Sequence, residues 1–192
     1  MSYETDFHKI LTFSSDIGLN IQNWGTPSDL LLADDNKQNK LHNLMVAILG
    51  NPPDLDCLAA KCIPIHAALI MEVGTIVGTM PALTIGSVIS DSGDKWFSVT
   101  EEEVRRWRTN GVKTPHSVKL HAWLTLPTME VIDFTLSPTY AKVQQQKNPY
   151  LKELEFGVIA KHADSVTGFS YKPVATGNDL PDKLHFPFVA IT

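Results

Sequence analysis

The chain has 192 residues, of which 43% are hydrophobic and 19% charged, and its net charge is −5. This composition excludes disordered, collagen-like and coiled-coil chains, and the length is that of one domain, residues 1–192, with a core over about 40–136. The basic residues form no cluster longer than Arg105-Arg106, so no nucleic acid is expected as a partner.

The sequence also favours a cytoplasmic protein. Met1–Asp6 lacks the basic start and apolar run of a secretory signal, and no apolar run is long enough to span a membrane. Cys57 and Cys62 are too close for a useful disulfide, so both are expected to be free thiols. Export by a non-classical route, as an effector, leaves no such trace and stays open, as does the oligomeric state.

The first expected elements are a turn or helix start at Thr26–Asp29 and a helix over Lys40–Leu49 that ends at Gly50. A second, Ala-rich helix is expected over Leu55–Val73. It would be capped by an aspartate just before it, kinked or broken at Pro64, and ended by Gly74. Because it is apolar on most sides, we expect it to be central.

The middle of the chain predicts one or two buried strands over Thr75–Ser90, followed by a turn at Asp91–Asp94. Thr100 and Glu103 form the spacing of a capping box, which predicts a short helix that ends near Gly111.

Alternating residues then predict a β-hairpin, with strands over Val118–Leu126 and Val131–Leu136. Further helices are expected over Tyr140–Gln146 and near Tyr150–Ala160, before a tail of low information. The expected fold class is α+β, with a helical part packed on an antiparallel sheet.

Cys57 is the first candidate for chemistry, since it would lie in the first turn of the second helix. A thiol reacts as the thiolate, which a helix N-terminus and a nearby imidazolium both stabilise. The neighbouring carboxylates of Asp54 and Asp56 oppose that charge, so a histidine would have to supply most of the activation.

His121 is the candidate base, and Asp133 is the candidate acid that orients it. A carboxylate inside an apolar strand is costly unless it is paired. If a three-residue loop, Pro127–Met129, joins the strands, Trp123 lies opposite Asp133 and His121 becomes its diagonal neighbour. A two- or four-residue loop would put the two side chains on opposite faces.

Cys57 at a helix start, His121-Ala122-Trp123 and Val131-Ile132-Asp133 together resemble the transglutaminase-like, papain-fold cysteine hydrolase superfamily, over roughly residues 54–136. The resemblance implies that Cys57 is the nucleophile, that His121 is base and acid, and that Asp133 holds the imidazole. It also implies acyl transfer through a thioester, on a peptide, protein or other amide-containing substrate, without a metal or organic cofactor.

Several alternatives stay open. If Pro64 lies in the first turn of the helix, Cys62 replaces Cys57 as the nucleophile. Cys57, Cys62, His66, His116 and His121 could serve as zinc ligands, although the spacing is unlike that of structural zinc sites, and His66 is interpreted as a hydrogen-bonded core residue. A catalytically inactive protein-interaction module on the same fold is the alternative function.

Overall fold

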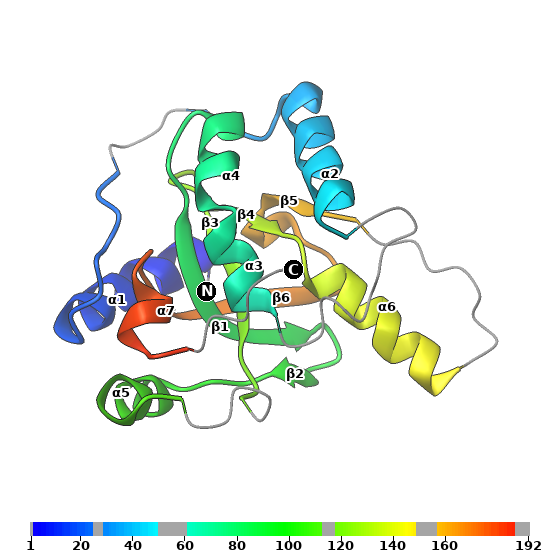
Figure 1. Cartoon of the computed structure of the whole chain (residues 1–192). Helices are drawn as coiled ribbons and strands as arrows, with labels where there is room; N and C mark the ends of the chain where they lie inside the picture. The colour runs from blue at the N-terminus through cyan, green and yellow to red at the C-terminus, as the bar shows by residue number, and fades with distance from the viewer. Residues whose placement is uncertain (1, 25–28, 50–60, 113–117, 149–156, 187–192) are drawn as a thin grey trace.

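The computed structural model describes residues 2–24, 29–49, 61–112, 118–148 and 157–186. Within these ranges, seven α-helices flank an antiparallel sheet of six strands, which confirms the α+β class (Figure 1). The helices are α1 (Tyr3–Asp16), α2 (Asp35–Leu49), α3 (Cys62–Ala68), α4 (Ile70–Val77), α5 (Glu101–Asn110), α6 (Leu136–Lys147) and α7 (Leu180–Lys183). The strands are β1 (Ala82–Ser90), β2 (Lys95–Phe97), β3 (His121–Thr125), β4 (Glu130–Asp133), β5 (Ile159–His162) and β6 (Phe169–Thr176).

Strand β1 organises the sheet. It pairs with β2 through a tight turn, with β3 from Ala82 opposite Thr125 to Gly86 opposite His121, and with β6 along most of its length. The sheet continues from β3 to β4 and β5. This pairing brings the start of β3 beside the middle of β1, and His121 therefore lies within the sheet rather than on a loop.

The two faces of the sheet bury different helices. On one face, Ala122 and Leu124 belong to the large core that also contains Ile63, Ile65 and Val73 of α3 and α4. On the other face, Trp123 packs in a second cluster with Tyr3 and Phe7 of α1. The alternation of β3 thus separates two cores, and helix α3 is held directly against β3.

The hairpin and the capped helix confirm two local predictions. Thr100 and Glu103 form the complete capping box of α5, and Gly111 follows as its C-cap. Leu124 pairs with Ile132, which corresponds to a three-residue loop of residues 127–129. Met129 takes the left-handed conformation there (φ 60°), the position that glycine usually fills in such loops.

Other boundaries were wrong. The second helix does not run from residue 55 to 73: Lys61 is a non-helical N-cap, α3 begins at Cys62 with Pro64 in its first turn, and α4 continues past Gly74 to Val77. The expected strand at Thr75 is therefore helical in its first residues, and β1 begins at Ala82.

The predictions near the termini also changed. A helix was expected near Tyr150–Ala160, but the last residues of that range, which the structure describes, belong to strand β5. Helices α2 and α6 begin several residues earlier than predicted. The tail of low information contains the long strand β6. The turn expected at Thr26–Asp29 lies mostly outside the described residues.

Candidate active site

Asp133 ends β4 and is completely buried. Its Oδ1 accepts the backbone N–H groups of Thr135 (2.9 Å) and Leu136 (3.0 Å), at the start of α6. Its Oδ2 accepts the Tyr171 hydroxyl at 2.8 Å and Nε2 of His121 at 2.6 Å. Burial by itself disfavours the carboxylate, but the charge and hydrogen bond of His121 outweigh it and hold the pKa of Asp133 well below its usual range.

His121 begins β3, with only 1% of its surface exposed. Burial disfavours a charged ring, but the charge and hydrogen bond of Asp133 overcome this cost and raise the pKa of His121 to about 10. The ring stacks on Phe97, with centroids 4.9 Å apart, and lies 6.1 Å from the Trp123 ring. The neighbouring aromatic rings therefore fix the plane of the imidazole, and the hydrogen bond to the carboxylate fixes the orientation of the ring within that plane.

Cys62 is the third member of the arrangement. It is the first residue of α3 and is partly exposed, and it lies close enough to the His121 ring to contribute to the raised pKa of that ring. Because Nε2 of His121 is bonded to Asp133, Nδ1 is the ring nitrogen that remains to exchange a proton with the sulfur. The imidazole thus lies between a thiol and a carboxylate, the order that thiol nucleophiles require.

His66 links helix α3, which carries Cys62, to the residue that follows Asp133. Its Nδ1–H donates to the carbonyl oxygen of Cys62 (2.7 Å), and its Nε2 accepts the backbone N–H of Phe134 (3.0 Å). A ring that accepts an N–H at Nε2 is neutral, and complete burial correspondingly lowers the pKa of His66 to about 4. The 3.6 Å approach of Nε2 to Asp133 is therefore not an ion pair. The interpretation of His66 as a hydrogen-bonded core residue is confirmed.

The structure brings two of the three residues expected from the sequence together, His121 and Asp133. Cys57 lies outside the described residues, and so does His116. Among the described residues, Cys62, the alternative nucleophile, lies beside the His121 ring. Both ring nitrogens of His66 are already bonded to backbone groups, which takes it out of the set of possible zinc ligands.

Sequence reasoning missed Tyr171 and the linking role of His66. Tyr171 comes from β6, in the region that carried little pattern, and no spacing along the chain relates it to Asp133. For His66 a signal existed: it is four residues after Cys62, so the two share one face of a helix. That spacing places His66 near Cys62, but only the fold shows that Nε2 of His66 accepts the backbone N–H of Phe134.

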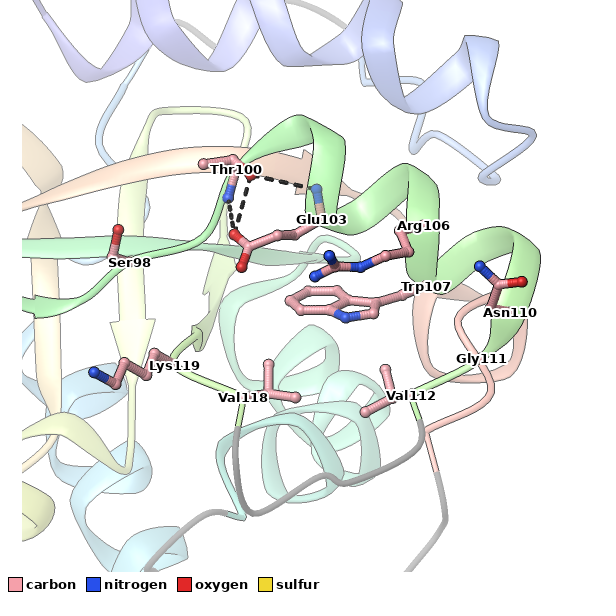
Figure 2. Close-up of a pocket in the computed structure, with 10 residues that line it drawn as sticks. All are labelled: Ser98, Thr100, Glu103, Arg106, Trp107, Asn110, Gly111, Val112, Val118 and Lys119. Carbon is pink, nitrogen blue, oxygen red and sulfur yellow. Dashed lines mark hydrogen bonds between the residues drawn. The ribbon is translucent and has the colours of Figure 1, made fainter.

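A cleft of about 830 Å³ lies between α5 and the segment before β3 (Figure 2). Trp107, Val112 and Val118 supply its apolar lining, and the guanidinium of Arg106 lies beside the indole of Trp107. Lys119, at its edge, is two residues before His121. The volume is within the range of small-molecule sites.

In the described ranges, no helix is long and apolar enough to cross a membrane, and no group of three or more His, Cys, Asp or Glu side chains is arranged to hold a metal ion. Comparison of the chain with family models, curated proteins and solved structures finds no match.

Proposed function

We propose that this protein is a thiol-dependent acyl-transfer enzyme of the papain-like kind that acts on amide bonds, with Cys62 as the nucleophile. The observation that carries the proposal is the position of the His121 ring, which lies beside Cys62 and is hydrogen-bonded through Nε2 to Asp133 at 2.6 Å. A charged imidazole beside a sulfur favours the thiolate, which is the reactive form.

The reaction follows from the role of each group. The Cys62 thiolate attacks the carbonyl carbon, and the C–N bond breaks as His121 gives its proton to the leaving amine, which leaves a thioester. His121 then takes a proton from water or a second nucleophile, whose attack on the thioester breaks the C–S bond, releases the acyl group and restores the thiolate and the imidazolium. Water as the second nucleophile gives hydrolysis, which is deamidation when the leaving amine is ammonia, and another nucleophile gives transfer.

Asp133 orients and stabilises the imidazolium without accepting its proton. Its two oxygens receive hydrogen bonds from Thr135, Leu136, Tyr171 and His121, and each of these bonds favours the ionised carboxylate. The backbone N–H of Cys62 is at the first position of α3, where no carbonyl of the same helix can accept it. That N–H is suited to stabilise the oxyanion of the tetrahedral intermediate.

The test measures how fast iodoacetamide alkylates each cysteine at pH 7, by mass spectrometry of the intact and digested protein. An unperturbed thiol with a pKa near 8.5 is only about 3% thiolate at this pH, so complete ionisation can raise the rate up to about 30-fold. Cys57 and Cys62 act as internal comparators. We expect Cys62 to react faster, and His121→Gln to remove the difference.

His42 provides the matched control, because it is an exposed histidine on α2, and His42→Gln should leave the alkylation rate of Cys62 unchanged. Fast labelling of Cys57 instead of Cys62 would transfer the nucleophile role to Cys57. Equal and slow labelling of both thiols would contradict the enzymatic proposal and favour an inactive interaction module. Cleavage of a panel of amide substrates by wild type and by Cys62→Ala then identifies the reaction.

A further inference from the structure

A second cleft, of about 430 Å³, lies between β2 and α6 and has no part in the chemistry described above. Six of its eleven lining residues are polar: Ser90, Ser92, Asp94, Thr139, Gln144 and Lys147. The other five are apolar or aromatic: Trp96, Phe97, Leu136, Tyr140 and Val143. Clefts of this size that combine apolar walls with a few polar groups at the edge are typical of small-molecule and side-chain binding sites.

Two lining residues of the cleft also contact the candidate active site. The ring of Phe97 stacks on His121, with centroids 4.9 Å apart and planes 30° apart. The backbone N–H of Leu136 donates to Oδ1 of Asp133. A group that contacts Phe97 in the cleft is therefore separated by one aromatic ring from the imidazole that would handle the proton of the substrate.

The wall farther from His121 keeps apolar side chains in solvent. Tyr140 is 45% exposed and Val143 is 39% exposed, both on α6. Trp96 stacks on Tyr140 with centroids 4.9 Å apart and planes 21° apart, which joins β2 to α6 across the cleft. Scattered exposed apolar residues are ordinary, but here they gather in a hollow beside a reactive site.

We infer, on the basis of the proposed function, that this cleft binds a bulky apolar group, an aromatic ring or branched aliphatic chain, attached next to the reacting amide of the substrate. Because Phe97 both lines the cleft and stacks on His121, such a group would be attached close to the reacting carbon. Burial of such a group against Trp96 and Phe97 supplies binding energy that small polar amides lack.

The first experiment compares two alkylating amides, N-(2-phenylethyl)chloroacetamide and N-methylchloroacetamide, as reagents for Cys62. We expect the phenylethyl reagent to react about tenfold faster, once the rates are corrected with free cysteine. Val143→Glu and Tyr140→Ala should remove this preference. Met71→Glu is the matched control, because Met71 is an apolar residue on α4 that is 64% exposed and is not part of the cleft wall.

The second experiment does not depend on the reactivity of Cys62. The indole N–H signal of Trp96, assigned with Trp96→Phe, is followed by NMR during titration with N-acetyl-L-phenylalaninamide and with N-acetylglycinamide. A saturable shift with the first compound alone supports the inference. No shift with either compound overturns it.

The two experiments separate the inference from the proposed function. Reactive Cys62 without a preference for the phenylethyl reagent overturns the apolar site and leaves the enzyme proposal intact. Slow alkylation of Cys62 by iodoacetamide removes the enzyme proposal, whatever the Trp96 signal does. A wild-type dimer in sedimentation velocity that Val143→Glu dissociates would assign the cleft to a second copy of the chain and overturn the inference.

Discussion

Tyr171 donates its hydroxyl to Oδ2 of Asp133 at 2.8 Å, the same oxygen that receives the His121 ring. The tyrosine lies on β6 and its ring packs 4.7 Å from that of Trp123, so its position is set by the aromatic cluster on the α1 face of the sheet. Burial and the neighbouring charge of Asp133 both raise the pKa of Tyr171, which keeps the hydroxyl protonated as a donor. The cluster around Trp123 thus positions Tyr171, and Tyr171 in turn holds the carboxylate of Asp133 in place.

Tyr171→Phe should lower the free energy of unfolding by about 2 kcal/mol, because it removes a buried hydrogen bond to a charged group. The alkylation rate of Cys62 should fall as well, since Asp133 is less firmly held. Urea denaturation and iodoacetamide labelling measure the two effects. Tyr140→Phe, at an exposed tyrosine, is the control and should change the stability little. Equal stability of Tyr171→Phe and wild type would show that the hydrogen bond contributes nothing.

Asp133→Asn should destabilise the fold by about 3 kcal/mol at neutral pH, since it leaves a buried imidazolium without its counter-charge. It should also lower the pKa of His121, because the charge that raises this pKa to about 10 is removed. Chemical denaturation gives the first quantity, and NMR titration of the His121 ring gives the second.

The same variant should change the response of stability to alkaline pH. The pKa of His121 is raised in the folded state, so its stabilising contribution is complete below about 6.5 and is lost as pH rises toward about 10. Wild type should therefore lose stability across this window, and Asp133→Asn should lose less. A wild-type stability that stays constant from pH 6.5 to 10 would contradict a charged His121.

His66 should produce the opposite response at acid pH. Its folded pKa is lowered to about 4 from 6.5, so the unfolded chain binds the proton first, and stability falls as pH drops from about 6.5 to 4. The loss from this residue should be about 3 kcal/mol, measured by urea denaturation at a series of pH values. The stability that Asp133 contributes is lost only at still lower pH, because its pKa in the folded state is depressed.

His66→Gln should remove most of the stability loss between pH 6.5 and 4, even though the variant is less stable throughout. His42→Gln, at an exposed position, should keep the wild-type profile. If His66→Gln and wild type lose stability in parallel across this window, His66 is not the buried neutral group that the hydrogen bonds indicate.

Gly86→Ala should lower the free energy of unfolding, because it disturbs the pairing of β1 with β6 next to the site. A Cβ at Gly86 would lie 2.1 Å from the carbonyl oxygen of Lys172 and 2.7 Å from the Trp123 ring, and the first of these atoms belongs to the paired backbone of β6. We expect a loss of at least about 3 kcal/mol in thermal or urea unfolding. Gly157→Ala, where a Cβ meets nothing within 4 Å, is the control. Tolerance of Gly86→Ala would mean that β6 is held less closely than the structure indicates.

Local patterns predicted the parts of the fold that depend on neighbours in the sequence. The capping box needs only Thr100 and Glu103, and the parity of a three-residue loop decides that His121 and Asp133 share a face. These predictions held because each rests on contacts among residues a few positions apart. The side chains that a hairpin places together do not depend on the remainder of the chain.

The start of helix α3 could not be predicted in this way. The aspartates before Cys57 and the proline at residue 64 both satisfy rules for a helix beginning, and the sequence left both choices open. In the fold α3 begins at Cys62, whose carbonyl is held by His66, which in turn is held by the backbone of Phe134. That last contact spans 68 residues along the chain.

The sequence by itself therefore predicted the α+β class and the hairpin, and the cost of an unpaired buried carboxylate made Asp133 the candidate partner of His121. The pairing itself depended on the three-residue loop, which the structure shows. Only the tertiary structure showed that Cys62 lies beside the imidazole, that Tyr171 donates a hydrogen bond to the carboxylate, and that Phe97 lies between His121 and a second cleft. These relations join strands and helices through packing in three dimensions, and packing leaves no periodicity in the sequence.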